Sequence, residues 1–104
     1  MVIYEVNVEV APEVLPQYRL WLSQHVREIL KFKGFQHAEV WTDVAGAADQ
    51  WVGISIHYHC DTIANLEEYL QQHAPHLRAD ATNRFGDHFR ARRRILTNGE
   101  RFAL

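Results

Sequence analysis

The sequence predicts an α+β fold of the ferredoxin-like type, in which a four-stranded antiparallel sheet carries helices on one face. Two stretches, residues 2–10 and 51–59, alternate between apolar and polar or small residues, as strands with one buried face do. Between them, residues 13–33 carry apolar side chains at helical spacing. With the remaining elements, the order along the chain is β-α-β-β-α-β, which defines this fold.

The first strand and the first helix have clear boundaries. In residues 2–10 the even-numbered positions are apolar or aromatic, and Ala11-Pro12 ends the pattern because proline has no backbone N–H. Residues 13–33 follow as a long amphipathic helix. Pro16 is tolerated because it lies in the first turn, and Gly34 ends the helix.

A hairpin follows the first helix. Residues 35–44 predict a second strand, less regular than the first, with polar and aromatic side chains such as His37 on one of its sides. Residues 45–50 are small or polar and predict a loop. That loop leads into the strand over residues 51–59, so the two strands pair as a hairpin.

The second half of the chain supplies the remaining helix and strand. Residues 61–62 offer capping side chains for a helix over residues 63–73, and a further helical segment over residues 75–85 ends at Gly86. The last strand covers residues 88–96. Right-handed crossovers then place the first and third strands in the centre of the sheet, the other two at its edges, and the helices on one face.

The length and composition of the chain favour one small domain, residues 1–104. A chain of this length with 47% apolar residues needs no disulfide or metal to fold, and its single cysteine, Cys60, has no internal partner, as expected in a reducing compartment. We find no signal peptide and no membrane-spanning run, so we expect a soluble cytoplasmic protein with no membrane partner. The net charge of −2 argues against a nucleic-acid partner.

The sheet face turned away from the helices collects an unusual set of residues. From the central strands it receives Ile3, Glu5, Asn7, Glu9, Gly53, Ser55, His57 and His59. The edge strands add His37, Glu39 and Trp41 on one side and Arg90, Arg92 and Arg94 on the other. Trp41 is poorly suited to water, whereas carboxylates and imidazoles are poorly suited to a dry face. A partly closed polar cavity reconciles the two, and its simplest lid is a second copy of the same sheet.

RNA-recognition modules share this element order but present stacking aromatic residues on the two central strands. The equivalent positions here hold Glu5 and Asn7 on one strand and Gly53, Ser55 and His57 on the other. Acidic and small residues therefore occupy the stacking platform. The sequence again predicts no nucleic-acid partner.

The two histidines of the third strand are the leading candidates for chemistry. His57 and His59 are two residues apart, so their side chains point the same way about 7 Å apart at the backbone. They could share a metal ion with Glu5, Glu9 or Glu39, but the spacing is weakly specific, and we predict a polar lining or dimer-interface pair and no metal ligand. In the catalytic hypothesis one imidazole acts as general base, and Glu5 orients it or accepts a proton.

The arginines of the last strand divide between the two faces of the sheet. Arg90, Arg92 and Arg94 share the open face, and Arg93 points the other way. A planar guanidinium suits the carboxylate or phosphate of an anionic ligand. Charged side chains also protect an edge strand against further pairing, which is the interpretation we favour, although the two roles can hold for different arginines.

Several short motifs carry a family resemblance that covers nearly the whole chain. They are Val2-Ile3-Tyr4-Glu5-Val6-Asn7, His73-Ala74-Pro75 with Leu77-Arg78, Arg84-Phe85-Gly86, Phe89-Arg90-Ala91 and Arg93-Arg94-Ile95-Leu96. These motifs resemble an uncharacterised family of small bacterial proteins, which itself looks like part of the dimeric α+β barrel superfamily. That resemblance implies that two ferredoxin-like subunits press their sheets together into one barrel. The superfamily includes cofactor-free monooxygenases, haem-handling enzymes, muconolactone-isomerase-like proteins and stress-induced proteins, so it implies no single activity.

We therefore predict a homodimer that binds, and in one hypothesis turns over, a small organic or anionic ligand. The ligand would lie between sheet and helices or across the paired sheets. The candidate catalytic residues are His57, His59 and Glu5, and the candidate ligand-binding residues are Asn7, Glu9, Trp41, Ser55 and Arg92. By family analogy an enzyme of this kind would be a cofactor-independent monooxygenase or isomerase, so no cofactor is predicted. The other alternative is a non-catalytic structural or regulatory dimer.

Overall fold

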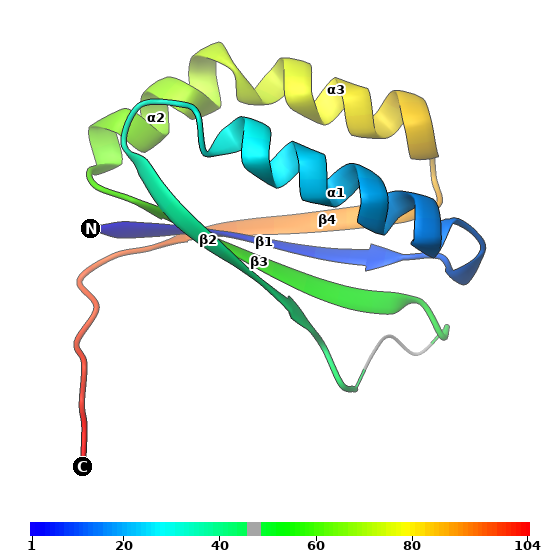
Figure 1. Cartoon of the computed structure of the whole chain (residues 1–104), viewed down its shortest axis with the longest axis horizontal. Coiled ribbons are helices and arrows are strands. Elements are labelled where there is room, and N and C mark those ends of the chain that lie inside the picture. Colours follow the sequence, from blue (N-terminus) through cyan, green and yellow to red (C-terminus); the bar gives the residue numbers. More distant parts are fainter. Residues whose placement is uncertain (46–48) are drawn as a thin grey trace.

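The computed structural model of the chain describes residues 1–45 and 49–104 (Figure 1). The strands are β1 (Val2–Val10), β2 (Phe35–Thr42), β3 (Val52–Cys60) and β4 (Phe89–Leu96). The helical elements are the 3-10 helix η1 (Pro12–Val14) and the α-helices α1 (Leu15–Ile29), α2 (Ile63–Gln72) and α3 (Ala74–Phe85). The sheet is antiparallel, with the order β2-β3-β1-β4. The predicted ferredoxin-like α+β class is confirmed.

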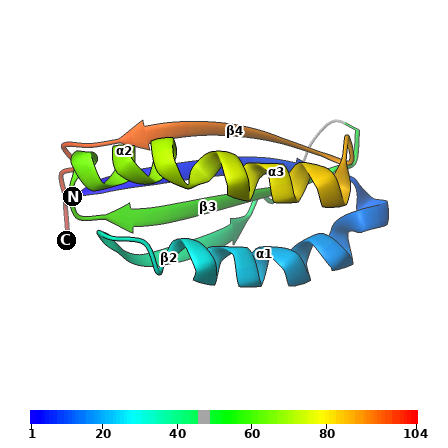
Figure 2. The same cartoon turned by 90° about the horizontal axis from the view of Figure 1, so that it is seen from above.

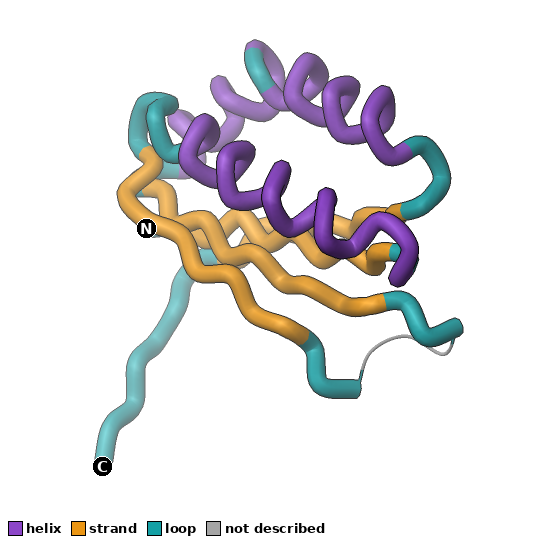
Figure 3. The backbone as a smooth tube through the Cα atoms, turned by 45° about the vertical axis from the view of Figure 1, so that its right-hand side comes forward, coloured by secondary structure: helices purple, strands orange, loops and turns teal. Residues whose placement is uncertain are grey.

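The α-helices cover one face of the sheet and leave the other face bare (Figures 1 and 2). Seen from above, α1 runs along one side of this layer, and α2 and α3 follow one another along the other side (Figure 2). The tube view shows the same two layers, with the C-terminal residues leading away from the sheet (Figure 3). Among the described residues, no helix is long and apolar enough to cross a membrane.

The first helix differs from its prediction at both ends. It begins as the 3-10 turn η1 rather than as an α-helix, and α1 ends at Ile29, four residues before the predicted end. The backbone N–H groups of Lys31 and Phe32 bond to carbonyls three residues back, which tightens the chain after the helix. Gly34 then adopts φ +91°, a left-handed conformation that glycine reaches without strain.

The second helical region matches the predicted division into two segments. The Thr62 hydroxyl accepts a hydrogen bond from the Asn65 N–H (3.1 Å) and so caps α2, as expected. The chain breaks at His73, and Pro75 lies in the first turn of α3, where its missing N–H costs little. Gly86 ends α3 with φ +54°.

The core lies between the sheet and the helices. The strands supply Val2, Tyr4, Val8, Val10, Ile54, Ile56, Tyr58 and Cys60 to it. The helices supply Tyr18, Leu22, Ile29, Leu66, Tyr69, Ala74 and Phe85. The rings of Tyr4 and Tyr58 stack with centroids 5.8 Å apart. Cys60 is a fully buried free cysteine, and burial raises the pKa of its thiol.

The edge strand β2 contains an irregularity that decides which face His37 joins. Phe35 pairs with Cys60 and His37 pairs with His59, so the register shifts by one residue between the two pairs. Without the shift, residues two apart would share a face. With it, Phe35 packs its ring against Tyr58 in the core, while His37 stacks on His59 on the open face.

The predicted hairpin loop begins earlier than expected. β2 ends at Thr42, two residues short of the predicted end, because the Asp43 side chain accepts a hydrogen bond from the Ala45 N–H (3.0 Å) and turns the chain. β3 begins and ends one residue later than predicted. Of the loop predicted over residues 45–50, residues 46–48 lie outside the described residues.

Candidate functional site

The open face of the sheet is a grid of side chains in rows that cross the strands in the order β2, β3, β1, β4. The middle row is Glu39, His57, Glu5 and Arg94. On one side of it lies the row Trp41, Ser55, Asn7 and Arg92, followed by Gly53, Glu9 and Arg90. On the other side lies the row His37, His59, Ile3 and Leu96. All eight predicted site residues therefore lie on this face.

Glu5 is the most connected carboxylate of the grid, and it is only 5% exposed. Arg94 donates two hydrogen bonds to it, from Nε to Oε1 (2.7 Å) and from Nη2 to Oε2 (3.3 Å), and Asn7 Nδ2 donates a third to Oε1 (2.6 Å). The hydrogen bonds from Arg94, and then from Asn7, lower the pKa of Glu5 below its usual 4.5. Glu5 is thus a carboxylate fixed by three hydrogen bonds, and it is better suited to orienting an imidazole than to accepting a proton.

The two predicted catalytic imidazoles have different partners. His57 Nε2 lies 3.2 Å from Ser55 Oγ and 3.4 Å from Glu5 Oε2. His59 Nε2 instead lies 2.8 Å from Glu39 Oε1. Although their positions share one face of one strand, the two rings do not converge on a common point.

A second cluster forms around His59 at the β2 edge. His37 Nε2 lies 3.5 Å from Glu39 Oε2, and the rings of His37 and His59 stack with centroids 4.0 Å apart. The hydrogen bond from His59 lowers the pKa of Glu39. The sequence placed His37 and Glu39 on this face but did not make His37 a site residue. Direct pairing of His37 with His59 depends on the register shift in β2, which the sequence did not indicate.

The five predicted ligand-binding residues line one hollow of about 320 Å³ on the open face. They are Asn7, Glu9, Trp41, Ser55 and Arg92. The indole of Trp41 forms part of the wall and is 59% exposed. These five residues come from all four strands. They were grouped from the sequence alone, and the fold places them around the same hollow.

The three open-face arginines of β4 differ in their partners. Arg94 is paired with Glu5. Arg90 contacts Glu9 and Asp49, each at 2.8 Å, and its guanidinium lies over the ring of Trp51. Arg92 forms no ion pair within the part of the chain that the structure describes.

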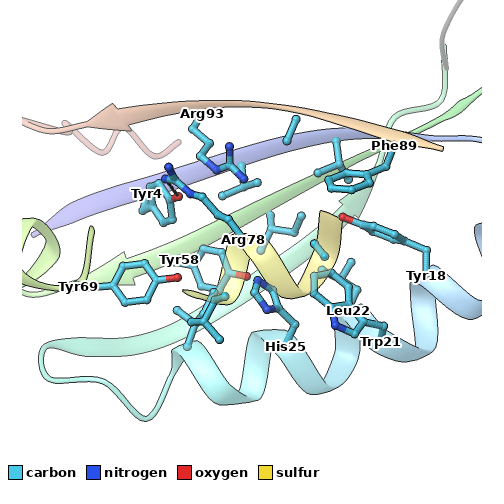
Figure 4. Close-up of a pocket in the computed structure, with 17 residues that line it drawn as sticks. Tyr4, Tyr18, Trp21, Leu22, His25, Tyr58, Tyr69, Arg78, Phe89 and Arg93 are labelled. Atoms are coloured by element: carbon cyan, nitrogen blue, oxygen red, sulfur yellow. Dashed lines mark hydrogen bonds between the residues drawn. The ribbon is translucent and has the colours of Figure 1, made fainter. Parts of the chain in front are cut away.

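A second hollow lies between the sheet and the helices (Figure 4). Arg78, Arg93 and four tyrosines line it, and Arg78 Nη2 donates a hydrogen bond to the Tyr4 hydroxyl (3.0 Å). Burial lowers the pKa of His25, which also faces this space, to about 4. The hollow measures only about 40 Å³, which admits a few water molecules and no organic ligand. None of these residues was predicted as a site residue. Strand alternation turned Arg93 toward the helices, but nothing in the helix pattern shows that Arg78 and His25 turn inward to meet it.

Solved structures with low sequence identity share this fold. A Deinococcus radiodurans protein, provisionally described as an antibiotic biosynthesis monooxygenase, superposes with a TM-score of 0.77 at 17% identity, over 100% of this chain and 98% of that one. Rv0793 from Mycobacterium tuberculosis gives 0.66 at 10% identity, over 99% and 100%. A Bacillus halodurans protein of the ethyl tert-butyl ether (EthD) family gives 0.64 at 15% identity, over 98% and 100%.

At these identities the likeness establishes the fold alone. No curated protein matches the sequence. One family model does match, and it spans residues 1–98, which include every strand, every helix and the whole open face. The chain belongs to the family described as a domain of unknown function, DUF4286.

Proposed function

We propose that the protein is a single-domain homodimer that binds a small organic anion in the hollow of its open sheet face. The observation that carries this proposal is the hollow itself. Its volume is about 320 Å³, and every strand contributes at least one residue to its lining. That volume lies at the lower end of the range for small-molecule sites.

The chemistry of the lining favours a flat, negatively charged ligand. Trp41 offers a flat apolar surface, and Arg92 offers a guanidinium that carries no carboxylate partner among the described residues. Asn7 and Ser55 add neutral polar groups between them. Two carboxylates also line the hollow, and both have partners. Glu9 is bonded to Arg90, which also bonds to Asp49, and Asp43 accepts a hydrogen bond from the Ala45 N–H. An aromatic carboxylate satisfies this set.

A second copy of the chain would supply the missing wall. The hollow opens to solvent on the bare side of the sheet, whereas a small-molecule site normally buries most of its ligand. Trp41 and Leu96 are apolar groups exposed on the same face. The resemblance to the dimeric α+β barrel superfamily supports pairing through these faces.

Isothermal titration calorimetry with benzoate tests the binding proposal, with acetate and benzyl alcohol as probes that lack the ring or the charge. We expect benzoate to bind more tightly than either. Arg92→Gln should weaken benzoate binding about tenfold or more, because it removes a charge-assisted hydrogen bond. Arg101→Gln, a change of the same kind in the exposed C-terminal residues, should leave it unaltered. Equal affinity of wild type and Arg92→Gln would contradict the proposal.

Catalysis is the second candidate function. The observation in its favour is that His57 contacts both Glu5 and Ser55, which lines the hollow. By analogy with the Deinococcus protein, the activity would be that of a monooxygenase. The resemblance to the dimeric α+β barrel superfamily extends this to a cofactor-independent monooxygenase or isomerase, with His57 as general base. His59, held by Glu39, would have no part in this step.

Native mass spectrometry of the purified protein identifies any retained ligand, which is then the compound to test as substrate. If His57 is the base, His57→Gln should abolish turnover and leave benzoate affinity unchanged. Loss of the dimer in His57→Gln, without loss of any activity, would instead favour a structural or regulatory dimer.

A further inference from the structure

We propose that His37, Glu39 and His59 bind a divalent transition-metal ion such as Zn²⁺. The three side chains stand together at the β2 edge of the open face, in the middle row and the row of His37, and none of them lines the hollow. Two imidazoles and one carboxylate form a donor set that occurs in catalytic zinc sites. The site is separate from the hollow, so it does not depend on the proposed ligand.

The donor atoms are already close to the positions that a metal ion needs. One ligand atom from each of the three residues lies within 4.8 Å of the other two. Glu39 is central, with Oε1 2.8 Å from His59 Nε2 and Oε2 3.5 Å from His37 Nε2. With metal–ligand bonds of about 2.0–2.2 Å, tetrahedral ligand atoms lie roughly 3.3 Å apart. Small rotations of the two imidazole rings would bring the observed separations of 2.8 and 3.5 Å to this tetrahedral spacing.

The sheet register explains why the pair is His37 with His59. Residues directly opposite one another on neighbouring strands have Cβ atoms about 5 Å apart, closer than residues two apart on a single strand. His37 is directly opposite His59 because of the register shift in β2. His57 points to Glu5 and Ser55 and takes no part.

The charges around the cluster favour a cation. Glu39 supplies the carboxylate that both imidazoles contact. The arginine of the same row, Arg94, stands on the opposite edge strand and is paired with Glu5. The donor set has no thiolate and is not all oxygen, which selects Zn²⁺, Co²⁺, Ni²⁺ or Cu²⁺ over Ca²⁺ and Mg²⁺.

The site would leave at least one coordination position open. Three protein ligands are one fewer than a structural zinc site uses, and the remaining position belongs to water or a ligand in catalytic sites. His37 is 56% exposed in the single chain and stands on the edge strand β2, so an ion can reach the cluster from that edge of the sheet.

The test uses the full chain, stripped with EDTA and dialysed. Co²⁺ is titrated and followed by its visible absorption, and Zn²⁺ binding is measured by calorimetry. We expect one ion per chain. His37→Gln and Glu39→Gln should each weaken binding by at least the roughly 10–100-fold that loss of an outer hydrogen-bond partner costs a metal site. His76→Gln, the same change at an exposed histidine of α3, should bind as the wild type does.

Three results would overturn the site. The first is millimolar binding by the wild type, and the second is an equal loss of affinity in His76→Gln and His37→Gln. The third is one ion per two chains, which would mean a site shared between copies. Circular dichroism shows whether each variant is folded, and Glu39→Gln keeps the test decisive if His37→Gln is destabilised.

Discussion

His25 lies against Trp21 in the layer between helix and sheet, with ring centroids 4.4 Å apart. Burial lowers its pKa from 6.5 to about 4, Asp80 raises it somewhat, and Arg93 lowers it. As the pH falls from about 6.5 to about 4, His25 becomes protonated in the unfolded chain but stays neutral in the folded protein. We therefore expect the free energy of unfolding to fall across this window, because of His25.

Chemical denaturation at several pH values between 7 and 4 measures this effect. His25→Gln should flatten the pH dependence relative to the wild type, because glutamine does not titrate. His76→Gln serves as the matched control and should keep the wild-type slope, since His76 is exposed on α3. An unchanged slope in His25→Gln would contradict the assignment, and NMR titration of the ring would then report where His25 protonates.

Glu5 contributes in a lower pH range. Its folded pKa is lowered mainly by the hydrogen bonds from Arg94 and Asn7, so its contribution to stability is complete above pH 4.5 and is lost as the pH falls through the lowered value. Glu5→Gln should be less stable than the wild type at pH 7, and the difference should narrow below about pH 4.5. Glu67→Gln on α2 is the matched control and should be neutral.

Thermal unfolding followed by circular dichroism at pH 7 and pH 3 compares these variants. If the difference in stability between Glu5→Gln and the wild type stays constant with pH, then the shape of the Glu5 side chain, rather than its charge, makes it important. At this scale the site was partly predictable from the sequence. Alternation alone put Glu5, Asn7 and His57 on one face, but which carboxylate each imidazole contacts depends on the pairing of strands.

At the scale of elements, Gly34 decides how α1 connects to β2. Its φ is +91°, and a Cβ added there would lie 2.5 Å from Asp61 Oδ1 and 2.7 Å from Asn65 Cβ. Both the backbone conformation and the space therefore exclude a side chain. Gly34→Ala should lower the free energy of unfolding by about 2–5 kcal/mol. Gly99→Ala should change it by less than about 0.5 kcal/mol, because Gly99 has open space around it.

Urea denaturation of the two glycine variants provides the measurement. Similar stabilities would mean that the turn after α1 relaxes to accept a side chain. Reduced stability of Gly34→Ala alone would confirm that this turn is sterically closed.

Strands were easier to predict than the features that interrupt them. The alternation in β1 and β3 is regular because both are central strands with one face in the core. The bulge in β2 left no trace in local propensity, since Phe35 and His37 both fit a strand and only the pairing with β3 separates them. The end of α1 was missed because residues 30–33 continue the apolar spacing although the chain has already left the helix.

At the scale of the whole molecule, the chain measures 39 × 36 × 18 Å along its principal axes, and a helical layer covers one face of the sheet and leaves the other face bare. Two layers suffice to bury one side of a sheet. The other side of the sheet carries polar and charged side chains together with the exposed apolar side chains of Trp41 and Leu96. Water does not suit the apolar groups, and a dry interior does not suit the charged ones. Sequence patterning showed this conflict, whereas the size of the hollow could be known only once the four strands were placed side by side.

The dimer proposal can be tested at the centre of this face. Asn7 stands between Ser55 and Arg92 in its row, so Asn7→Arg would bring an added charge from each copy into the interface. Light scattering after size exclusion should report a dimer for the wild type at micromolar concentration and at least about a tenfold weaker dimer for Asn7→Arg. Glu67→Arg, on the helical side, should remain dimeric. A wild-type monomer, or equal dimerisation of the two variants, would contradict pairing through the open face.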